Sequence, residues 1–253
     1  MGIYLYNQSQ ISMIERACSV AAGVLDALES MVEEGVSTFE LDKFAGEFIA
    51  ARNGVPAFLG YRGYPAALCT SINEVVVHGI PSKKTRLKSG DIIGIDVGVL
   101  LDGYYGDTAR TYKIGKVDEK TELLLRVTEE SLLSGISKAV PGNRVSDISH
   151  AVEDLVVKHG FAPVREFVGH GIGTSLHEEP SIPNFGKPGK GPRLSNGMVL
   201  AIEPMINEGA YQVEVLADGW TAVTADRKLS AHFEHTIAIV DDVPRILTGR
   251  KAG

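Results

Sequence analysis

Two stretches of this 253-residue chain match each other without a gap at an offset of 107 residues, from position 87 to position 194. Residues 87–96 read LKSGDIIGID and residues 194–203 read LSNGMVLAIE, so a leucine, a glycine, an apolar run and a closing carboxylate coincide. The same offset superposes two sets of apolar positions with helical spacing, at 41, 44, 45, 48 and 49 and at 148, 151, 152, 155 and 156. Chance similarity is the simpler explanation, but a gapless ten-residue match favours a duplicated half.

Each half of the repeat predicts two helices followed by strands. Apolar stripes with glycine stop signals beyond them predict helices over residues 12–32, 38–52, 123–140 and 145–158. Strand-like runs cover residues 92–99, 106–112, 198–202, 210–216 and 233–240. Asp102-Gly103, between two of these runs, predicts a two-residue hairpin turn. The order indicates an α+β fold with a pseudo-twofold, in a single domain of residues 1–253 with halves at approximately 12–112 and 120–240.

The composition narrows the class of protein. With 44% apolar residues, a chain of 253 residues can bury roughly 70% of its unfolded surface without cross-links. Its two cysteines form no disulfide framework or zinc knuckle. We expect neither a secretory signal nor a membrane span, because no basic leader and no apolar run of about 18 residues is present. A net charge of −7 argues against DNA as a partner, so we expect a cytoplasmic protein.

Two aspartates lie where a solvated charge is not expected. Asp96 is inside the apolar run IIGIDVGVLL, and Asp107 follows in YYGDTART. If Asp102-Gly103 is the turn, residue 98 faces residue 107, and Asp96 and Asp107 become diagonal neighbours on one sheet face, about 7–8 Å apart. Two buried carboxylates this close repel each other, and a cation between them would remove the repulsion.

Three more residues extend this pattern. Glu203 closes the second apolar run at the position equivalent to Asp96, and Glu234 enters an apolar strand that the pseudo-twofold places opposite Asp107. His170, in the loop GHGIG, offers an imidazole ligand. Two divalent ions would balance four buried carboxylates, and an oxygen-rich set with one imidazole suits Mn, Fe, Co or Zn. The alternative is ordinary salt bridges, for which the candidate partners are Arg110, Arg144 and Arg165.

The ordered ligand pattern resembles the type I methionine aminopeptidases of the pita-bread metallopeptidase superfamily. The resemblance runs from the first helix to Val240, and it rests on the ligand pattern and on NEVVVHGIP (73–81), GHGIG (169–173) and IEP (202–204). The five-ligand pattern is shared by the whole superfamily, whereas GYRGYPAALCTSINEVVVHGIP (60–81) is typical of the shorter, bacterial methionine aminopeptidases. The resemblance implies a curved antiparallel sheet flanked by helix pairs.

The resemblance also implies a role for each ligand. Asp107 and Glu234 would bridge two divalent ions, Asp96 would hold one of them, and His170 and Glu203 the other. The α-amine of the substrate would bind at the ion held by Asp96. Glu203 would also carry a proton from the attacking water to the leaving amine.

Two further histidines and an apolar pocket complete the implied site. His78 and His177 lie in tight turns and would hydrogen-bond the substrate, although a lone histidine is more often satisfied by backbone groups. The implied pocket for the first side chain consists of Tyr61, Tyr64, Cys69, Leu59, Leu176 and Trp220. Some members of the family carry Phe where this chain has Leu176, and Cys where it has Leu59, which affects the shape of the pocket rather than the chemistry.

The function implied is removal of the initiator methionine from nascent proteins when the second residue is small, by a monomeric enzyme. Aminopeptidase P and prolidase use the same ligands, but they carry a large N-terminal domain that we do not expect here. A binding module of the same fold is a third interpretation, although such relatives typically lose ligands. The basic stretches 83–88 and 187–193 leave open a weak ribosome contact, for which a solvated loop is the simpler explanation.

Overall fold

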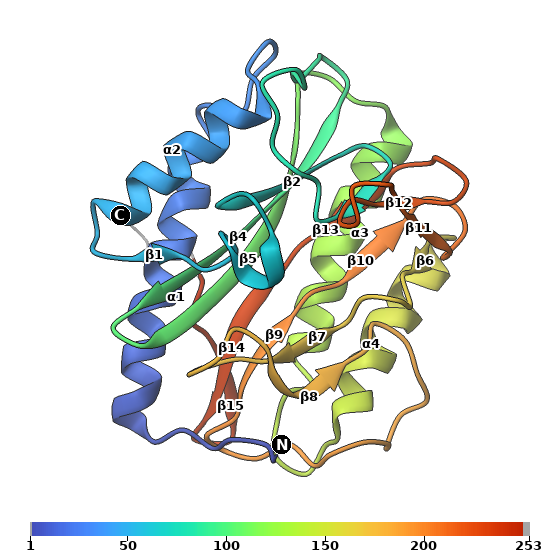
Figure 1. The fold of residues 1–253 in the computed structure, drawn as a ribbon. Helices are drawn as coiled ribbons and strands as arrows, with labels where there is room; N and C mark the ends of the chain where they lie inside the picture. Colours follow the sequence, from blue (N-terminus) through green and yellow to red (C-terminus); the bar gives the residue numbers. More distant parts are fainter. Residues whose placement is uncertain (1, 250–253) are drawn as a thin grey trace.

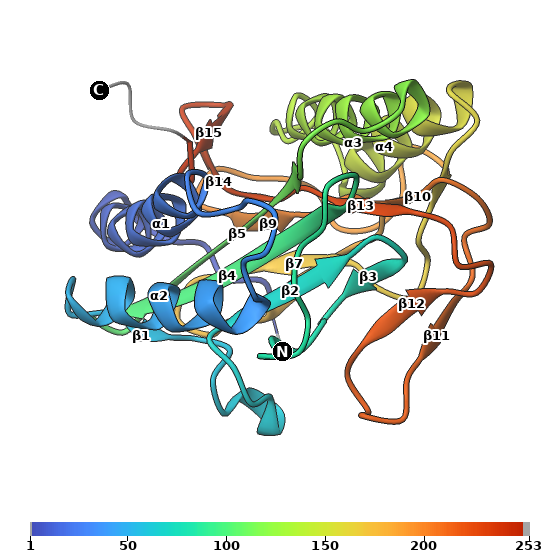
Figure 2. The ribbon, with the colours of Figure 1, turned by 90° about the horizontal axis from the view of Figure 1, so that it is seen from above.

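Two pairs of helices flank a set of antiparallel strands in the computed structural model, which describes residues 2–249. The helices are α1 (Gln8–Leu28), α2 (Thr38–Ala50), α3 (Glu119–Ile136) and α4 (Val145–Lys158). Figure 2 shows α1 and α2 on one side of the strands and α3 and α4 on the other. Among the described residues, no helix has both the length and the apolar character needed to cross a membrane.

The four predicted helices are confirmed, but α1 and α3 each lie four residues earlier in the chain than predicted. The reason is the residue that begins each helix. The side chain of Asn7 accepts a hydrogen bond from the Gln10 backbone N–H, and that of Asp118 accepts one from the Thr121 backbone N–H. Such N-caps satisfy amide groups that have no partner inside the helix, so they fix the start of a helix more strongly than its apolar stripe does.

The strands are short, apart from one long hairpin. They are β1 (Val55–Pro56), β2 (Leu68–Ile72), β3 (Val75–Val77), β4 (Ile92–Leu101), β5 (Tyr104–Lys113), β6 (Ala162–Pro163), β7 (Gly169–Gly171), β8 (Glu178–Ile182), β9 (Val199–Ile202), β10 (Met205–Asn207), β11 (Val213–Val215), β12 (Ala222–Thr224), β13 (Ser230–His232), β14 (His235–Val240) and β15 (Val243–Ile246). A short 3₁₀ turn, Tyr61–Gly63, precedes β2. The two larger sheets have the orders β1-β4-β2, with β5 on the other edge of β4, and β15-β14-β9-β7-β8.

The hairpin of β4 and β5 has the predicted register. Leu101 pairs with Tyr104, which leaves Asp102 and Gly103 as a two-residue turn with φ of 50° and 84°. Positive φ at both positions matches the turn type whose twist fits a β-hairpin. Gly98 therefore pairs with Asp107, as expected from the sequence.

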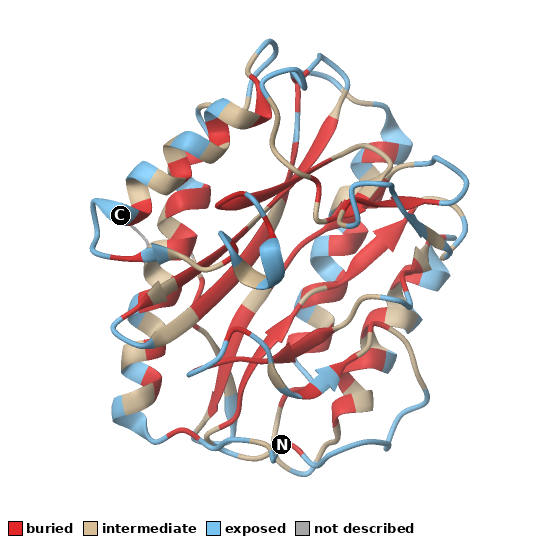
Figure 3. Cartoon of the chain, viewed as in Figure 1, coloured by how far each residue is buried: buried red, intermediate tan, exposed pale blue. Residues whose placement is uncertain are grey.

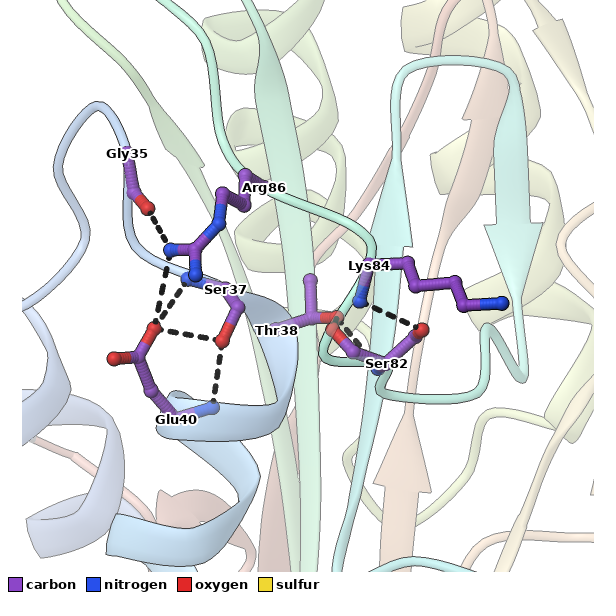
Figure 4. Close-up of polar contacts among 7 residues, drawn as sticks. All are labelled: Gly35, Ser37, Thr38, Glu40, Ser82, Lys84 and Arg86. Atoms are coloured by element: carbon purple, nitrogen blue, oxygen red, sulfur yellow. Dashed lines mark hydrogen bonds and ion pairs between the residues drawn. The ribbon is translucent and has the colours of Figure 1, made fainter.

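The repeat is visible in the contacts at the start of α2 and α4. An isolated antiparallel bridge joins Ser37 to Arg86, and its equivalent at an offset of 107 joins Arg144 to Arg193. In the first half, the Arg86 guanidinium donates to the Gly35 carbonyl at 2.6 Å and lies 3.7 Å from Glu40 (Figure 4). In the second half, Arg144 donates to the Gly191 carbonyl, also at 2.6 Å. An arginine of the bridge thus closes the local structure in each half, although Arg144 stands at the position equivalent to Ser37 and not to Arg86.

The halves meet along β5 and the segment 232–236. Threonine hydroxyls make most of the bonds across this seam: Thr236 donates to the Asp107 carbonyl at 2.7 Å, and Thr108 donates to the Glu234 carbonyl at 2.8 Å. The Glu234 N–H donates to the Ala109 carbonyl at 2.9 Å. Figure 3 shows these central strands as the most buried part of the molecule. The seam therefore places segments from both halves side by side in the interior.

Candidate functional site

One cavity of about 150 Å³ gathers the five predicted ligands and most of the predicted pocket residues. It is lined by Phe58, Tyr61, Arg62, Tyr64, Cys69, His78, Asp96, Asp107, His170, Leu176, His177, Glu203, Trp220 and Glu234. A larger, open groove of about 720 Å³ lies between the end of α1, β5 and α3, but it includes only Glu234 of the five ligands. The smaller cavity is therefore the candidate site.

The two aspartates are held by the hairpin. Asp96 pairs with Ala109 and Gly98 pairs with Asp107, so Asp96 and Asp107 are diagonal neighbours on one face of the sheet. On the other side of β4, Asp96 pairs with Cys69 of β2, whose buried thiol has its pKa raised by burial and by the nearby Asp96. Asp107 is 4% exposed. The local rule of hairpin pairing is sufficient to bring these carboxylates together.

The other three ligands come from the second half. His170 is the middle residue of β7, Glu203 follows β9 directly, and Glu234 directly precedes β14. Pairing of β9 with both neighbours fixes them, since His170 faces Ala201 and His235 faces Ile202. The Nε2 atom of His170 lies 3.5 Å from a Glu203 oxygen. Ligand atoms of Asp107, His170 and Glu234 all lie within 4.8 Å of one another.

The electrostatics of this cluster are those of a site that needs a cation. Burial raises the pKa of Asp107 to about 7 and raises the pKa values of the other three carboxyl groups, Asp96, Glu203 and Glu234, well above their ordinary values. One buried oxygen each of Asp96, Asp107 and Glu234 has no hydrogen-bond partner. Buried polar atoms rarely remain unpaired, so these oxygens fit metal ligands.

His170 is prepared to act as a nitrogen ligand. Its Nδ1 atom lies 2.9 Å from the Gly171 carbonyl, which can only accept, so Nδ1 carries the proton and Nε2 has a free lone pair. Burial lowers the pKa of His170 to about 4, which keeps the ring neutral at pH 7. A neutral imidazole oriented by a backbone carbonyl is the usual form of a metal-binding histidine. The donor set of four carboxylates and one imidazole thus fits borderline divalent ions such as Mn, Fe, Co or Zn.

His78 and His177 flank the cavity without belonging to the ligand cluster. His177 lies at its mouth, where Nδ1 is 2.9 Å from the Tyr61 hydroxyl and the ring centroid is 4.3 Å from that of His170. His78 has a φ of 60°, an uncommon conformation for a non-glycine residue, and its ring packs edge-on against Phe167 and Trp220. Burial lowers the pKa values of both histidines, so both rings are neutral at pH 7.

Five of the six predicted pocket residues line the cavity: Tyr61, Tyr64, Cys69, Leu176 and Trp220. The Tyr64 hydroxyl donates to the carbonyls of Leu68 and Gly79, both at 3.0 Å, so its polar atom is satisfied away from the apolar space. Leu59 was predicted wrongly as a lining residue. Its side chain is 57% exposed, and the preceding residue, Phe58, lines the cavity instead, because the chain enters a turn here, in which the Tyr61 N–H donates to the Phe58 carbonyl.

Sequence reasoning missed three features of the site. His232 is 4% exposed, its Nε2 atom has no hydrogen-bond partner, and it lies 3.7 Å from a Glu203 oxygen. The spacing of two residues between His232 and Glu234 was the available signal, because alternate residues of an extended chain share a face. The threonines of the seam carry no signal of this kind, since their partners are more than 100 residues away. Arg62 also lines the cavity, but its contact with the neighbouring Tyr61 ring is local and does not point to the site.

The comparisons with known proteins agree with this geometry. The model of metallopeptidase family M24 matches residues 12–241. A methionine aminopeptidase of Clostridium perfringens is 50% identical over 246 residues, which cover 97% of this chain and 98% of that protein. Methionine aminopeptidase 1 of Bacillus subtilis is 49% identical, over 94% of this chain and 96% of that protein. The crystal structure of the Thermotoga maritima methionine aminopeptidase superposes with a TM-score of 0.97 at 43% identity, covering 98% of this chain and all of that one.

The chain belongs to metallopeptidase family M24, and its fold is the pita-bread fold of that family, with duplicated halves. Family membership establishes that the enzyme uses divalent metal. Within the family the chain belongs with the type I methionine aminopeptidases, because it is identical to them at close to half of the aligned positions over nearly its whole length. Prolidases share the fold at lower similarity: the Pyrococcus horikoshii prolidase has a TM-score of 0.78 at 21% identity, and this chain covers 64% of it.

Proposed function

We propose that this aminopeptidase removes N-terminal methionine from peptides whose second residue is small, with two divalent ions held by the five ligands. The observation that carries the proposal is that unpaired, buried carboxylate oxygens and apolar side chains line one and the same cavity of about 150 Å³. A cleft of this kind, with few polar groups that converge, is the usual form of a small-ligand site.

Asp107 and Glu234 would hold both ions, Asp96 one of them, and His170 and Glu203 the other. The trio of Asp107, His170 and Glu234, with ligand atoms within 4.8 Å of one another, supports a position for one ion, and Asp96 extends the set toward β2. When bound, the ions supply positive charge that polarises the scissile carbonyl and lowers the pKa of a water molecule. Their identity among Mn, Fe, Co and Zn follows from supply as much as from this donor set.

The acid–base and binding groups of the chain surround that position. Glu203, with His170 and His232 beside its two oxygens, would take a proton at one carboxylate oxygen and deliver it to the leaving amine. With the Tyr61 hydroxyl as donor to Nδ1 of His177, the Nε2 atom carries the proton and would donate to the scissile carbonyl oxygen. His78, held in its strained turn, would donate to the adjoining amide.

The apolar walls of the cavity would select methionine at the first position. An unbranched, flexible thioether can enter a narrow slot between Tyr64, Cys69, Leu176 and Trp220, whereas β-branched side chains would collide with them. The edge-on contact of the rings of Tyr64 and Trp220, with centroids 5.1 Å apart, stiffens this wall. The ligands and His78 would lie beside the second residue of the substrate, so the same walls would exclude a bulky side chain there.

A peptide series tests the proposal. Metal-free enzyme with each metal restored would be assayed on Met-Ala-Ser, norleucine-Ala-Ser, Leu-Ala-Ser and Met-Pro peptides. We expect cleavage of the first two and a loss of about 10–200-fold for leucine, which is what an apolar pocket can discriminate. Equal cleavage of Leu-Ala and Met-Ala peptides would contradict the pocket, and a preference for proline at the second position would favour an Xaa-Pro peptidase. Two equivalents of metal per chain at full activity are expected.

The setting of the enzyme follows as a further part of the proposal. We infer a monomer in one domain that acts on nascent chains in the cytoplasm. In the basic stretch 83–88, the Arg86 guanidinium is used on Gly35 and Glu40, and the Lys83 ammonium lies over the Phe39 ring (Figure 4 draws Arg86). Because these two charged groups already have partners within the chain, we favour a solvated loop over a ribosome contact. Sedimentation with ribosomes at low and physiological salt would detect a weak contact.

A further inference from the structure

The segment before α1 is fixed to the rest of the molecule by its sixth residue. This segment runs along the lower edge of the molecule in the view of Figure 1 before α1 begins. The Tyr6 side chain is 6% exposed, although Tyr4 and Leu5 beside it are 51% and 59% exposed. The Tyr6 backbone N–H donates to the Gly197 carbonyl at 2.7 Å. Tyr6 is therefore the one fully buried residue of the described segment 2–7, in which Ile3 is half-buried and the others are exposed.

The Tyr6 hydroxyl is at the centre of a hydrogen-bond network on the loop between β7 and β8. It donates to the Glu178 carboxylate, with distances of 2.8 and 2.9 Å to the two oxygens, and it accepts from the Thr174 backbone N–H at 3.0 Å. The same carboxylate accepts from the Ser175 N–H at 2.9 Å and from the Thr174 hydroxyl at 3.1 Å. Tyr6 and Glu178 together hold consecutive peptide groups of this loop.

The loop is also shaped to receive the Tyr6 ring. A Cβ atom on Gly173 would lie 2.2 Å from both Cζ and the hydroxyl oxygen of Tyr6. Gly173 is not in the left-handed region, so space rather than backbone conformation is the reason that a glycine is needed here. The Gly173 carbonyl accepts from the Tyr105 N–H at 2.8 Å, which joins the loop to β5 near Asp107.

Two side chains of the proposed site lie between these anchors. Leu176, which is 2% exposed, forms a wall of the cavity, and His177 stands at its mouth. Leu176 and His177 occupy the positions between Ser175 and Glu178, and both of those residues are held by the network around Tyr6. Tyr6 thus holds the residues on both sides of Leu176 and His177, although it precedes Glu178 by 172 residues.

We infer that Tyr6 is a positioning residue for the reaction, which holds the 173–178 loop so that His177 and Leu176 face the bound substrate. This inference rests on the proposed role of His177. Burial raises the pKa of Tyr6 to about 12, so the hydroxyl remains a donor to Glu178 throughout the working pH range. A hydrogen bond from a neutral donor to a carboxylate is among the stronger ones in proteins, which suits a fixed rather than a mobile loop.

The test is Tyr6→Phe, which removes the hydroxyl and keeps the ring against Gly173. The matched control is Tyr4→Phe, which removes an exposed hydroxyl from the same segment. With Met-Ala-Ser as substrate, we expect Tyr6→Phe to lower kcat by about tenfold with little change in KM, because the loop contributes mainly when charge develops on the carbonyl. We also expect amide hydrogen exchange of residues 174–178 to accelerate by about tenfold, with unchanged metal content.

The outcomes separate this inference from the proposed function. Unchanged kcat and unchanged exchange in Tyr6→Phe, with a lowered kcat in His177→Ala, would overturn the positioning role alone. Unchanged kcat in His177→Ala would overturn the proposed role of His177 and this inference with it, whereas failure of the proposed function would appear in the peptide series. Glu178→Gln, which weakens the same network from its other end, gives the same readouts if Tyr6→Phe does not fold. The double variant should be no slower than the slower single variant, because both changes release one network.

Discussion

Replacement of Thr236 by valine removes a hydroxyl that joins the two halves at the backbone of Asp107, a proposed metal ligand. The side chain is fully buried; its hydroxyl donates to the Asp107 carbonyl at 2.7 Å and accepts from the Asp107 N–H at 3.3 Å. A buried group that loses its partner costs about 1–3 kcal/mol, and the longer contact belongs at the low end. We therefore expect the free energy of unfolding to fall by about 2–4 kcal/mol, or the melting temperature by about 4–16 °C for a chain of this size.

Urea unfolding and calorimetric metal titration would measure both consequences. Because Asp107 is a proposed ligand of both ions, loosening its backbone should weaken metal binding by about 10–100-fold. Thr236→Ser keeps the hydroxyl and is the matched control, and Thr108→Val tests the equivalent bond to the Glu234 carbonyl, at 2.8 Å. A Thr236→Val variant that is as stable as Thr236→Ser and binds metal as tightly as the unaltered protein would refute the reasoning.

Three other predictions concern the ligands, His177 and pH. Asp107→Ala and Glu234→Ala should each lower bound metal and remove nearly all activity, and full turnover with normal metal content in either would contradict the two-ion scheme. His177→Ala should lower kcat with metal content unchanged, whereas loss of metal would place His177 among the ligands. Asp107 should make the metal-free protein less stable as the pH rises from about 4 to about 7, because burial raises the pKa of Asp107 to about 7 and the folded state keeps, over this range, a proton that the unfolded state has already lost. Melting curves of the metal-free protein and of metal-free Asp107→Ala over this pH range would isolate the slope, because the buried histidines contribute equally to both proteins.

Much of the proposed metal cluster could be predicted because it depends on local rules. The Asp102-Gly103 turn fixes the register of the hairpin, and the register alone makes Asp96 and Asp107 diagonal neighbours. The repeat then predicts that Glu203 occupies the position equivalent to Asp96, because the matching apolar strand of the second half also ends in a carboxylate. Helix positions were less well predicted, since the apolar stripe gives the helix face and the capping residues Asn7 and Asp118 give its beginning.

The second hairpin shows where the repeat stops being informative. In the first half two residues separate β4 from β5, whereas β10 to β13 intervene between Glu203 and Glu234 in the second. The repeat predicts that Glu234 meets Asp107, but it does not predict how so long an insertion returns to the seam. The return depends on pairing of β14 with β9 and on threonine bonds to β5, which involve residues more than 30 and 120 positions apart.

The sequence by itself determined the fold class, the duplicated halves and the chemical type of the site. The spacing of apolar residues along helices and strands, and the internal repeat, can both be recognised in the chain alone. Only the tertiary structure decided which side chains form the walls and supports. In the structure Phe58, and not Leu59, lines the cavity, His232 lies beside Glu203, and the Tyr6 hydroxyl donates to Glu178. These contacts join segments far apart in the chain, and such pairings are set by how whole elements pack, not by any local pattern.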